Sequence, residues 1–280
     1  MLLPRCLIAT LAFDMSRQKM GQHFLGDLAW RKRIFATLPH AGPNTRDDTH
    51  DDAWVEIGAG HGEMTELLAA DGRRVIAIEA DPLLATRLRQ RAYGWPNVEV
   101  IEGDILDLNF DKFAPPRFRV YGNLPYYITS PILHRLFEQA ARIASIHIVV
   151  QLEVAERIVS PPGHREYGYL SVACQFYTEP KIVLRIPPGA FRPPPKVKSA
   201  LLQMNLPGER PSLGVSDEHA FLKFVQLCFG QKRKTLRNNL RIIVPDNRVH
   251  QILRDCNLAL DVRGEQLSLA QFALLFKVLS

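Results

Sequence analysis

The residues Asn123-Leu124-Pro125-Tyr126 form the stretch of the chain best suited to chemistry. The asparagine carries an amide, the proline fixes a turn that exposes the preceding backbone carbonyl, and the tyrosine offers an aromatic face. The stretch follows an apolar run that ends at Tyr121 and precedes a helical pattern that begins near Ser130. Hydrogen bonds and stacking could together hold a planar amine there. The sequence therefore predicts a reaction site at the end of a strand.

A glycine-rich turn upstream has the composition of a nucleoside-binding loop. Trp54–Ile57 predicts a short strand, and Gly58, Gly60 and Gly62 follow it before a helix that we expect over residues 63–70. Glycines let a backbone approach a ligand closely, and a helix N-terminus offers unpaired N–H groups. The GxGxG spacing differs from the GxGxxG of dinucleotide-binding enzymes, which favours a nucleoside without a pyrophosphate. A purely structural tight turn is the alternative interpretation.

Carboxylates follow the next two predicted strands. Glu79 comes after the strand predicted over residues 74–78, at a spacing from the glycines where an acidic side chain meets ribose hydroxyls. Asp104 follows the strand predicted over residues 98–101, and an aspartate there can accept a hydrogen bond from an adenine amine. Because predicted strands alternate with helices, we expect a doubly wound α/β sheet with ligands at its carboxyl edge. The strands are predicted at 54–57, 74–78, 98–101, 118–121 and 146–150.

The second half of the chain predicts a sheet edge and then a helical domain. Residues 181–186 and 199–205 have the pattern of two strands, with a proline-rich loop over 191–198 between them. A Pro, Gly and Ser-rich stretch at 207–216 marks a domain boundary. Helical spacing follows at 219–229, 234–243, 248–256 and 269–278. We therefore expect a disordered tail at 1–15, a catalytic domain at 16–207 and a small all-α domain at 208–280.

Composition limits the class of protein. The chain of 280 residues is 46% hydrophobic, which suffices for a packed core, and its formal charge is +6. Such a charge fits a nucleic-acid partner and equally an ordinary soluble enzyme. No segment approaches the roughly 20 apolar residues that a bilayer requires, so we expect no membrane anchor. Four widely separated cysteines disfavour a metal site and a disulfide framework, and they favour a reducing cytoplasm.

Cations concentrate after the domain boundary. Residues 231–240 carry Lys232, Arg233, Lys234 and Arg237, and Lys196 adds a cation in the proline-rich loop. Such a run is often a solvated helix face. Beside a site for a planar amine, the same cations predict contacts with the phosphates of a nucleic acid.

Taken together, these motifs resemble those of the KsgA-type ribosomal RNA adenine dimethyltransferases. The elements occur in that family's order over most of the chain: Gly21 to Asp27, Val55 to Thr65, Glu79, Gly103-Asp104-Ile105, Asn123 to Tyr126, Gln151 to Ile158, Tyr167 to Val172, and Phe191 to Ser199. The resemblance implies a Rossmann-like class I S-adenosylmethionine-dependent methyltransferase sheet. It also implies dimethylation of the exocyclic amine of adenines in small-subunit (16S) ribosomal RNA during ribosome biogenesis.

The resemblance also implies roles for particular residues. S-adenosylmethionine would be bound by Gln22, His23, Leu25, Gly58, Gly60, Glu79, Asp104, Ile105 and Asn123. Catalysis would fall to Asn123, Leu124, Pro125 and Tyr126, with Phe191 closing the other face of the adenine. RNA would contact Lys196, Lys232, Arg233, Lys234 and Arg237. We further expect no metal, a cytoplasmic monomer, and an assembly intermediate of the small ribosomal subunit as the partner.

Three alternatives stay open at this point. The erythromycin-resistance methyltransferases share the catalytic motifs but act on large-subunit rRNA, and similar motifs also serve exocyclic amines in DNA. A non-catalytic RNA-binding assembly factor can have the same fold, although the intact Asn123 to Tyr126 stretch argues against it. An NAD-dependent dehydrogenase is disfavoured by the GxGxG spacing.

Overall fold

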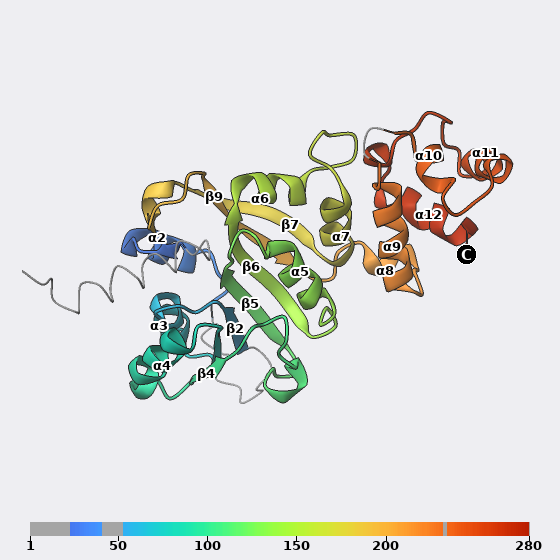
Figure 1. Cartoon of the computed structure of the whole chain (residues 1–280). Coiled ribbons are helices and arrows are strands. Elements are labelled where there is room, and N and C mark those ends of the chain that lie inside the picture. The colour runs from blue at the N-terminus through green and yellow to red at the C-terminus, as the bar shows by residue number, and fades with distance from the viewer. Residues whose placement is uncertain (1–22, 41–52, 232–233, 280) are drawn as a thin grey trace, which may run out of the picture. The chain divides into compact units, whose positions relative to one another are not determined.

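The computed structural model describes residues 23–40, 53–231 and 234–279 (Figure 1). The tail expected at 1–15 and the predicted site residues Gln22, Lys232 and Arg233 lie outside these ranges. The chain divides into two compact units. The first comprises Met1–Leu152 and Val183–Leu202, and the second comprises Glu153–Ile182 and Gln203–Ser280. Residues 153–182 thus group with the C-terminal helices rather than with the preceding strands.

A seven-stranded sheet carries the fold, in the order β4-β3-β2-β5-β6-β9-β7. Strands β4, β3, β2, β5 and β6 pair in parallel, which confirms the predicted doubly wound α/β architecture. The strands span Ala53–Ile57 (β2), Val75–Glu79 (β3), Val98–Glu102 (β4), Phe118–Asn123 (β5), Ile143–Gln151 (β6), Glu179–Ile186 (β7) and Ser199–Asn205 (β9). The strand order reverses between β2 and β5, and ligands of such sheets bind at the carboxyl ends beside that point.

Burial explains why these segments form strands. Every residue of β2 and β3 is buried, as expected for parallel strands covered on both faces. The helices α3 (Glu63–Ala70) and α4 (Pro82–Arg91) pack against β3. Asp81 caps α4 by accepting hydrogen bonds from the backbone N–H groups of Leu83 and Leu84, at 2.8 and 3.2 Å. The cap fixes where the chain turns after Glu79, beside the end of β3.

A short second sheet joins the start of the described chain to the proline-rich loop. Strand β1 (Phe24–Leu25) pairs antiparallel with β8 (Phe191–Arg192). Helix α2 (Leu28–Phe35) follows, and Asp27 caps it by accepting from the backbone N–H of Trp30 at 3.1 Å. The backbone N–H of Asp27 also donates to the Ala190 carbonyl. These contacts fix the segment before α2 against the loop.

The second unit is helical apart from its short parts of β7 and β9. Residues 170–177 form most of α7, and buried side chains run along most of that helix. Gln175 of α7 donates to the carbonyls of Ile158 and Ser160 and so holds the end of α6. The helices of this part are α6 (Leu152–Val159), α7 (Tyr169–Tyr177), α8 (Arg210–Leu213), α9 (Glu218–Cys228), α10 (Leu236–Leu240), α11 (Asp246–Asp255) and α12 (Leu269–Leu279). Within the described ranges, no helix is long and apolar enough to cross a membrane.

Candidate active site

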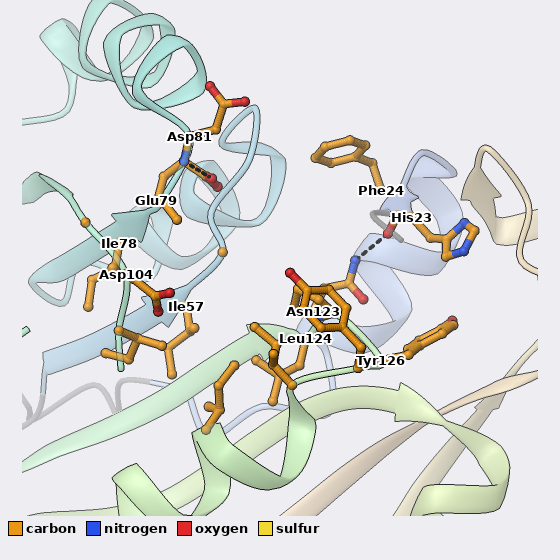
Figure 2. Close-up of a pocket in the computed structure, with 18 of the residues that line it drawn as sticks. His23, Phe24, Ile57, Ile78, Glu79, Asp81, Asp104, Asn123, Leu124 and Tyr126 are labelled. Carbon is orange, nitrogen blue, oxygen red and sulfur yellow. Dashed lines mark hydrogen bonds between the residues drawn. The ribbon is translucent and has the colours of Figure 1, made fainter. Parts of the chain in front are cut away.

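A cavity of about 450 Å³ lies at the carboxyl ends of β2, β3, β4 and β5, all within the first unit (Figure 2). Its walls are mostly apolar, and a few polar groups converge on it, which is the usual character of a cofactor site. Each predicted loop contributes to it: Gly58 from the glycine turn, Glu79 after β3, Asp104 after β4 and Asn123 at the end of β5. The sequence predicts these residues at one sheet edge, and the structure brings them around one cavity.

The glycine turn and Glu79 form one unit. Gly58 and Gly60 have φ of 71° and 60°, in the left-handed region that favours glycine. A Cβ on Gly60 would lie 3.0 Å from the Phe24 ring, so a larger residue would require that ring to shift. The buried Glu79 carboxylate accepts hydrogen bonds from the backbone N–H groups of Gly60 at 2.7 Å and Asp81 at 2.9 Å. Lone pairs remain on the same two oxygens for hydroxyl groups of a ligand.

An apolar slot lies beside Glu79. Ile57, Ile78, Leu83 and Ile105 line it, and Ile105 is only 4% exposed. The Asp104 Oδ1 atom accepts from the Leu106 backbone N–H at 2.9 Å, which fixes the orientation of that carboxylate. A planar base in this slot would meet apolar side chains on its faces and a carboxylate at its edge.

The amide of Asn123 is oriented by the chain itself. Its Nδ2 donates to the His23 backbone carbonyl at 2.8 Å (Figure 2). That bond uses the donor end of the amide and leaves the Oδ1 atom as an acceptor. The asparagine can therefore receive a hydrogen bond from a ligand amine without any rearrangement.

The next two residues present a second acceptor. The Leu124 N–H donates to the Val149 carbonyl at 3.1 Å, which joins the backbone to β6. The Pro125 carbonyl accepts from the Ile128 N–H and the Thr129 Oγ1 atom, at 3.2 and 3.3 Å. By contrast, no group in the described ranges donates to the Leu124 carbonyl. The turn thus has one carbonyl engaged and the other available.

Tyr126 is held by its hydroxyl group. The hydroxyl lies 2.7 Å from the Ser199 Oγ atom, and the ring centroid lies 5.6 Å from that of His23. Partial burial raises the pKa of the phenol, so Tyr126 stays neutral at physiological pH. The His23 Nδ1–H donates to the Pro193 carbonyl at 2.8 Å, because that oxygen can only accept. The aromatic wall is therefore attached to the proline-rich loop.

Two predicted site residues lie in the core instead. Phe191 is 0% exposed and packs with Leu25, Ala190 and other apolar side chains. Phe191 belongs to β8, which pairs with β1, and its ring is buried among these side chains. Closure of the second face of the adenine by Phe191 stays a prediction. Leu25 is opposite Phe191 in that ladder and is likewise buried, and it does not line the cavity.

The predicted RNA-contacting cations have different surroundings. Lys196 of the first unit and Lys234 of the second are both exposed. Arg237 instead donates from Nε and Nη2 to the two carboxylate oxygens of Asp246, at 2.9 and 2.6 Å. Arg241 makes the same two-point contact with that carboxylate. The two guanidinium groups hold the pKa of Asp246 far below its usual range.

Several cavity residues escaped sequence reasoning. Phe24, Leu83, Tyr127 and Ile132 all line the cavity. Phe24 lies within the motif Gly21 to Asp27, and Tyr127 directly follows the stretch Asn123 to Tyr126. Closeness to these motifs was the sequence signal that could have identified both residues as part of the cavity. Ile132 belongs to the buried face of α5 (Thr129–Phe137), and apolar spacing alone marks it only as a core residue.

Comparison with known proteins agrees with this geometry. Residues 14–280 match the model of a family described as ribosomal RNA adenine dimethylase. The chain belongs to this family. Two relatives are each called ribosomal RNA small subunit methyltransferase A. The one from Koribacter versatilis is 40% identical over 277 residues, and the alignment covers 94% of both chains. The one from Acidobacterium capsulatum is 41% identical over 266 residues, and the alignment covers 94% of this chain and 91% of the relative.

Solved structures of this kind share the fold. A dimethyladenosine transferase from Plasmodium falciparum superposes with a TM-score of 0.75 at 24% identity, covering 91% of this chain and 97% of its own. The 23S rRNA methyltransferase ErmE gives a TM-score of 0.65 at 28% identity, covering 91% and 99%. The family assignment and these neighbours confirm the class I methyltransferase fold that the motifs predicted.

Proposed function

We propose that this protein transfers methyl groups from S-adenosylmethionine to the exocyclic amine of adenines in small-subunit ribosomal RNA, twice per adenine, during ribosome biogenesis. The observation that carries the proposal is the pair of acceptors at the cavity, Asn123 Oδ1 and the Leu124 carbonyl. An unsubstituted adenine amine has two N–H groups to match them. Membership of the dimethylase family and the names of the relatives support the same reaction.

The residues of the cavity fit S-adenosylmethionine. The Glu79 carboxylate, held by two backbone N–H groups, would accept from the ribose hydroxyls. Asp104 and the apolar slot at Ile105 would take the adenine, and Gly58 leaves room for the methionine part. The spacing of these groups along one sheet edge suits a nucleoside with a short side chain. When bound, the cofactor supplies a methyl group on a sulfonium.

The two acceptors would activate the target amine. The lone pair of an adenine amine is delocalised into the ring, which makes it a poor nucleophile. Hydrogen bonds from its two N–H groups to Asn123 Oδ1 and the Leu124 carbonyl favour a pyramidal nitrogen whose lone pair points at the methyl group. The surplus proton leaves to water after transfer, because neither oxygen acceptor is a base. Alignment of the amine with the methyl group would supply most of the rate enhancement, since effective molarities of oriented groups reach ~10⁵ M or more.

Tyr126 would hold the base for this reaction. Stacking of a base on an aromatic side chain is worth about 1–3 kcal/mol. The hydroxyl contact with Ser199 and the neutral phenol keep the ring in one orientation. Phe191 is buried in this structure, and its contact with the other face of the base stays a prediction.

RNA recognition would involve both units. An adenine that is paired or stacked must leave its helix to reach the cavity, so the protein has to hold the surrounding backbone. We assign this role to Lys196 on the loop of the first unit and to Lys234 in the helical unit. Lys232 and Arg233, which lie outside the described residues, stay predicted RNA contacts. We further propose that the protein acts as a cytoplasmic monomer on an assembly intermediate of the small subunit.

The test is a comparison of substrates. Purified protein is incubated with labelled S-adenosylmethionine and, separately, with unmethylated small subunits, large subunits and duplex DNA. We expect label in small-subunit RNA alone, and mass spectrometry of its nucleosides should show N6,N6-dimethyladenosine. Label confined to large subunits would favour the erythromycin-resistance activity, and binding of RNA without any transfer would indicate an assembly factor.

A further inference from the structure

The tyrosine that follows the reactive stretch has no task in this mechanism. Tyr127 lines the cavity, yet 66% of it is exposed. Within the described part of the chain, it makes no hydrogen bond and no ring contact. Among the exposed large apolar side chains there, only Tyr127 and Leu83 line the cavity. Leu83 lies beside Asp81, on the side assigned to the cofactor, whereas Tyr127 lies on the side of the target amine.

The backbone beneath Tyr127 is fixed. A turn over residues 125–128 is closed by the hydrogen bond from the Ile128 N–H to the Pro125 carbonyl, at 3.2 Å. The same carbonyl accepts from Thr129 Oγ1 at the first residue of α5. A tyrosine on such a turn has only two side-chain torsions to order, so a partner that stacks on it meets a small entropic cost.

The two adjacent tyrosines differ in how they are held. Tyr126 is tied to Ser199 and partly buried, and its ring lies near His23. Tyr127 has no such tie, and its ring faces solvent at the cavity wall. Tyr126 is therefore placed to stack on a base inside the cavity. Tyr127 is placed to stack on a planar group at the mouth of the cavity.

Single-stranded RNA supplies such a group. When one base leaves the stack to enter a pocket, its neighbour loses a stacking partner and exposes an apolar face. Aromatic side chains replace that partner whatever the base, because every base has a π face. We propose that Tyr127 stacks on the nucleobase adjacent to the target adenine and so positions the RNA strand at the cavity. This inference rests on the proposed function and names a further contact of its substrate.

The test measures methyl transfer to unmethylated small subunits by Tyr127→Ala, Tyr127→Leu and Tyr127→Phe. Tyr93→Ala is the matched control, because Tyr93 is 96% exposed and does not line the cavity. We expect KM for the subunits to rise about 5- to 150-fold in the Ala variant, following the usual strength of base stacking. The Leu variant should resemble Ala, because leucine keeps apolar area but has no ring face. The Phe variant and the control should stay within about twofold of wild type.

Other readouts separate this role from its rivals. The Kd for S-adenosylmethionine, the kcat at saturating subunits and the melting temperature should not change in the Ala variant. A large rise in Kd for the cofactor would make Tyr127 a cofactor contact and overturn the proposal. A wild-type KM in the Ala or Leu variant would also overturn it. If the wild-type protein methylates no small subunit, the proposed function fails. If the wild-type protein is active and Tyr127→Ala leaves KM unchanged, only the inference about Tyr127 is refuted.

Discussion

Replacing Asn123 with alanine should separate chemistry from binding. The change removes the Oδ1 acceptor, which the structure presents to the cavity, and the Nδ2 donor, which holds the His23 carbonyl at 2.8 Å. Loss of one preorganised polar contact to a transition state costs about 2.7–4 kcal/mol, equivalent to roughly 10²–10³ in kcat. Loss of the internal hydrogen bond costs about 0.5–1.5 kcal/mol of stability. We therefore expect a larger effect on kcat than on folding or on cofactor affinity.

The assay combines three measurements on the same preparations. Single-turnover transfer from labelled S-adenosylmethionine to unmethylated small subunits gives the chemical rate, calorimetry gives the cofactor Kd, and thermal unfolding gives stability. Asn97→Ala is the matched control, because its amide donates to the carbonyls of Ala69 and Arg73, at 2.8 and 2.7 Å, away from the cavity. The control should lose stability and keep its rate.

Two outcomes would refute the reasoning about Asn123. One is a folded Asn123→Ala protein whose transfer rate lies within about threefold of wild type, far short of the expected loss. The other is an equal fall in rate in the Asn97→Ala control, which would show that loss of any partly buried amide contact slows the enzyme.

Replacing Glu79 with glutamine should raise the Kd for S-adenosylmethionine at least about tenfold by calorimetry, because a charged acceptor for hydroxyl groups is lost; an unchanged Kd would contradict ribose binding there. Burial raises the pKa of Glu56 from 4.5 to about 8, so the folded protein keeps a proton that the unfolded chain releases. The free energy of unfolding therefore falls between about pH 4.5 and 8, by about 1.4 kcal/mol per pH unit. Glu56→Gln should flatten that slope in unfolding measurements, and parallel slopes would implicate another group. Asp246→Asn should release Arg237 and Arg241 from their ion pairs and so tighten RNA binding. A salt titration of RNA binding should then show a steeper dependence of affinity on salt concentration. Weaker binding at every salt concentration would show that the carboxylate organises the arginines instead.

The parallel strands were predictable because their burial shows directly in the sequence. A strand covered on both faces is a short run of β-branched and other apolar residues, as in Val75–Glu79, and the prediction for 74–78 differs from it by one residue at each end. Glu79 and Asp104 followed from the same logic, since the residues after parallel strands meet at one edge of the sheet. Local pattern and chain order were sufficient for this part of the site.

Contacts between distant segments were not predictable in this way. The ladder of β1 with β8 decides that Phe191 points into the core, and nothing in the local sequence around Phe191 specifies its partner. Arg237 lies in a run of cations, which suggested an RNA contact. Its guanidinium instead donates to Asp246, the first residue of the next helix, α11. A short apolar run such as residues 170–177 fits a buried helix and a buried strand equally well, so the local sequence does not decide between them.

The contact between Asn123 and the His23 carbonyl has a consequence for synthesis of the protein. The segment at His23 is held in place by β8, whose residues leave the ribosome after those of the reactive turn. A nascent chain that ends before Phe191 can form the central parallel strands, but it has no partner for β1. We therefore expect methyl-transfer activity to appear late in translation, when the chain beyond β8 has emerged, so that partly made molecules leave RNA unmodified.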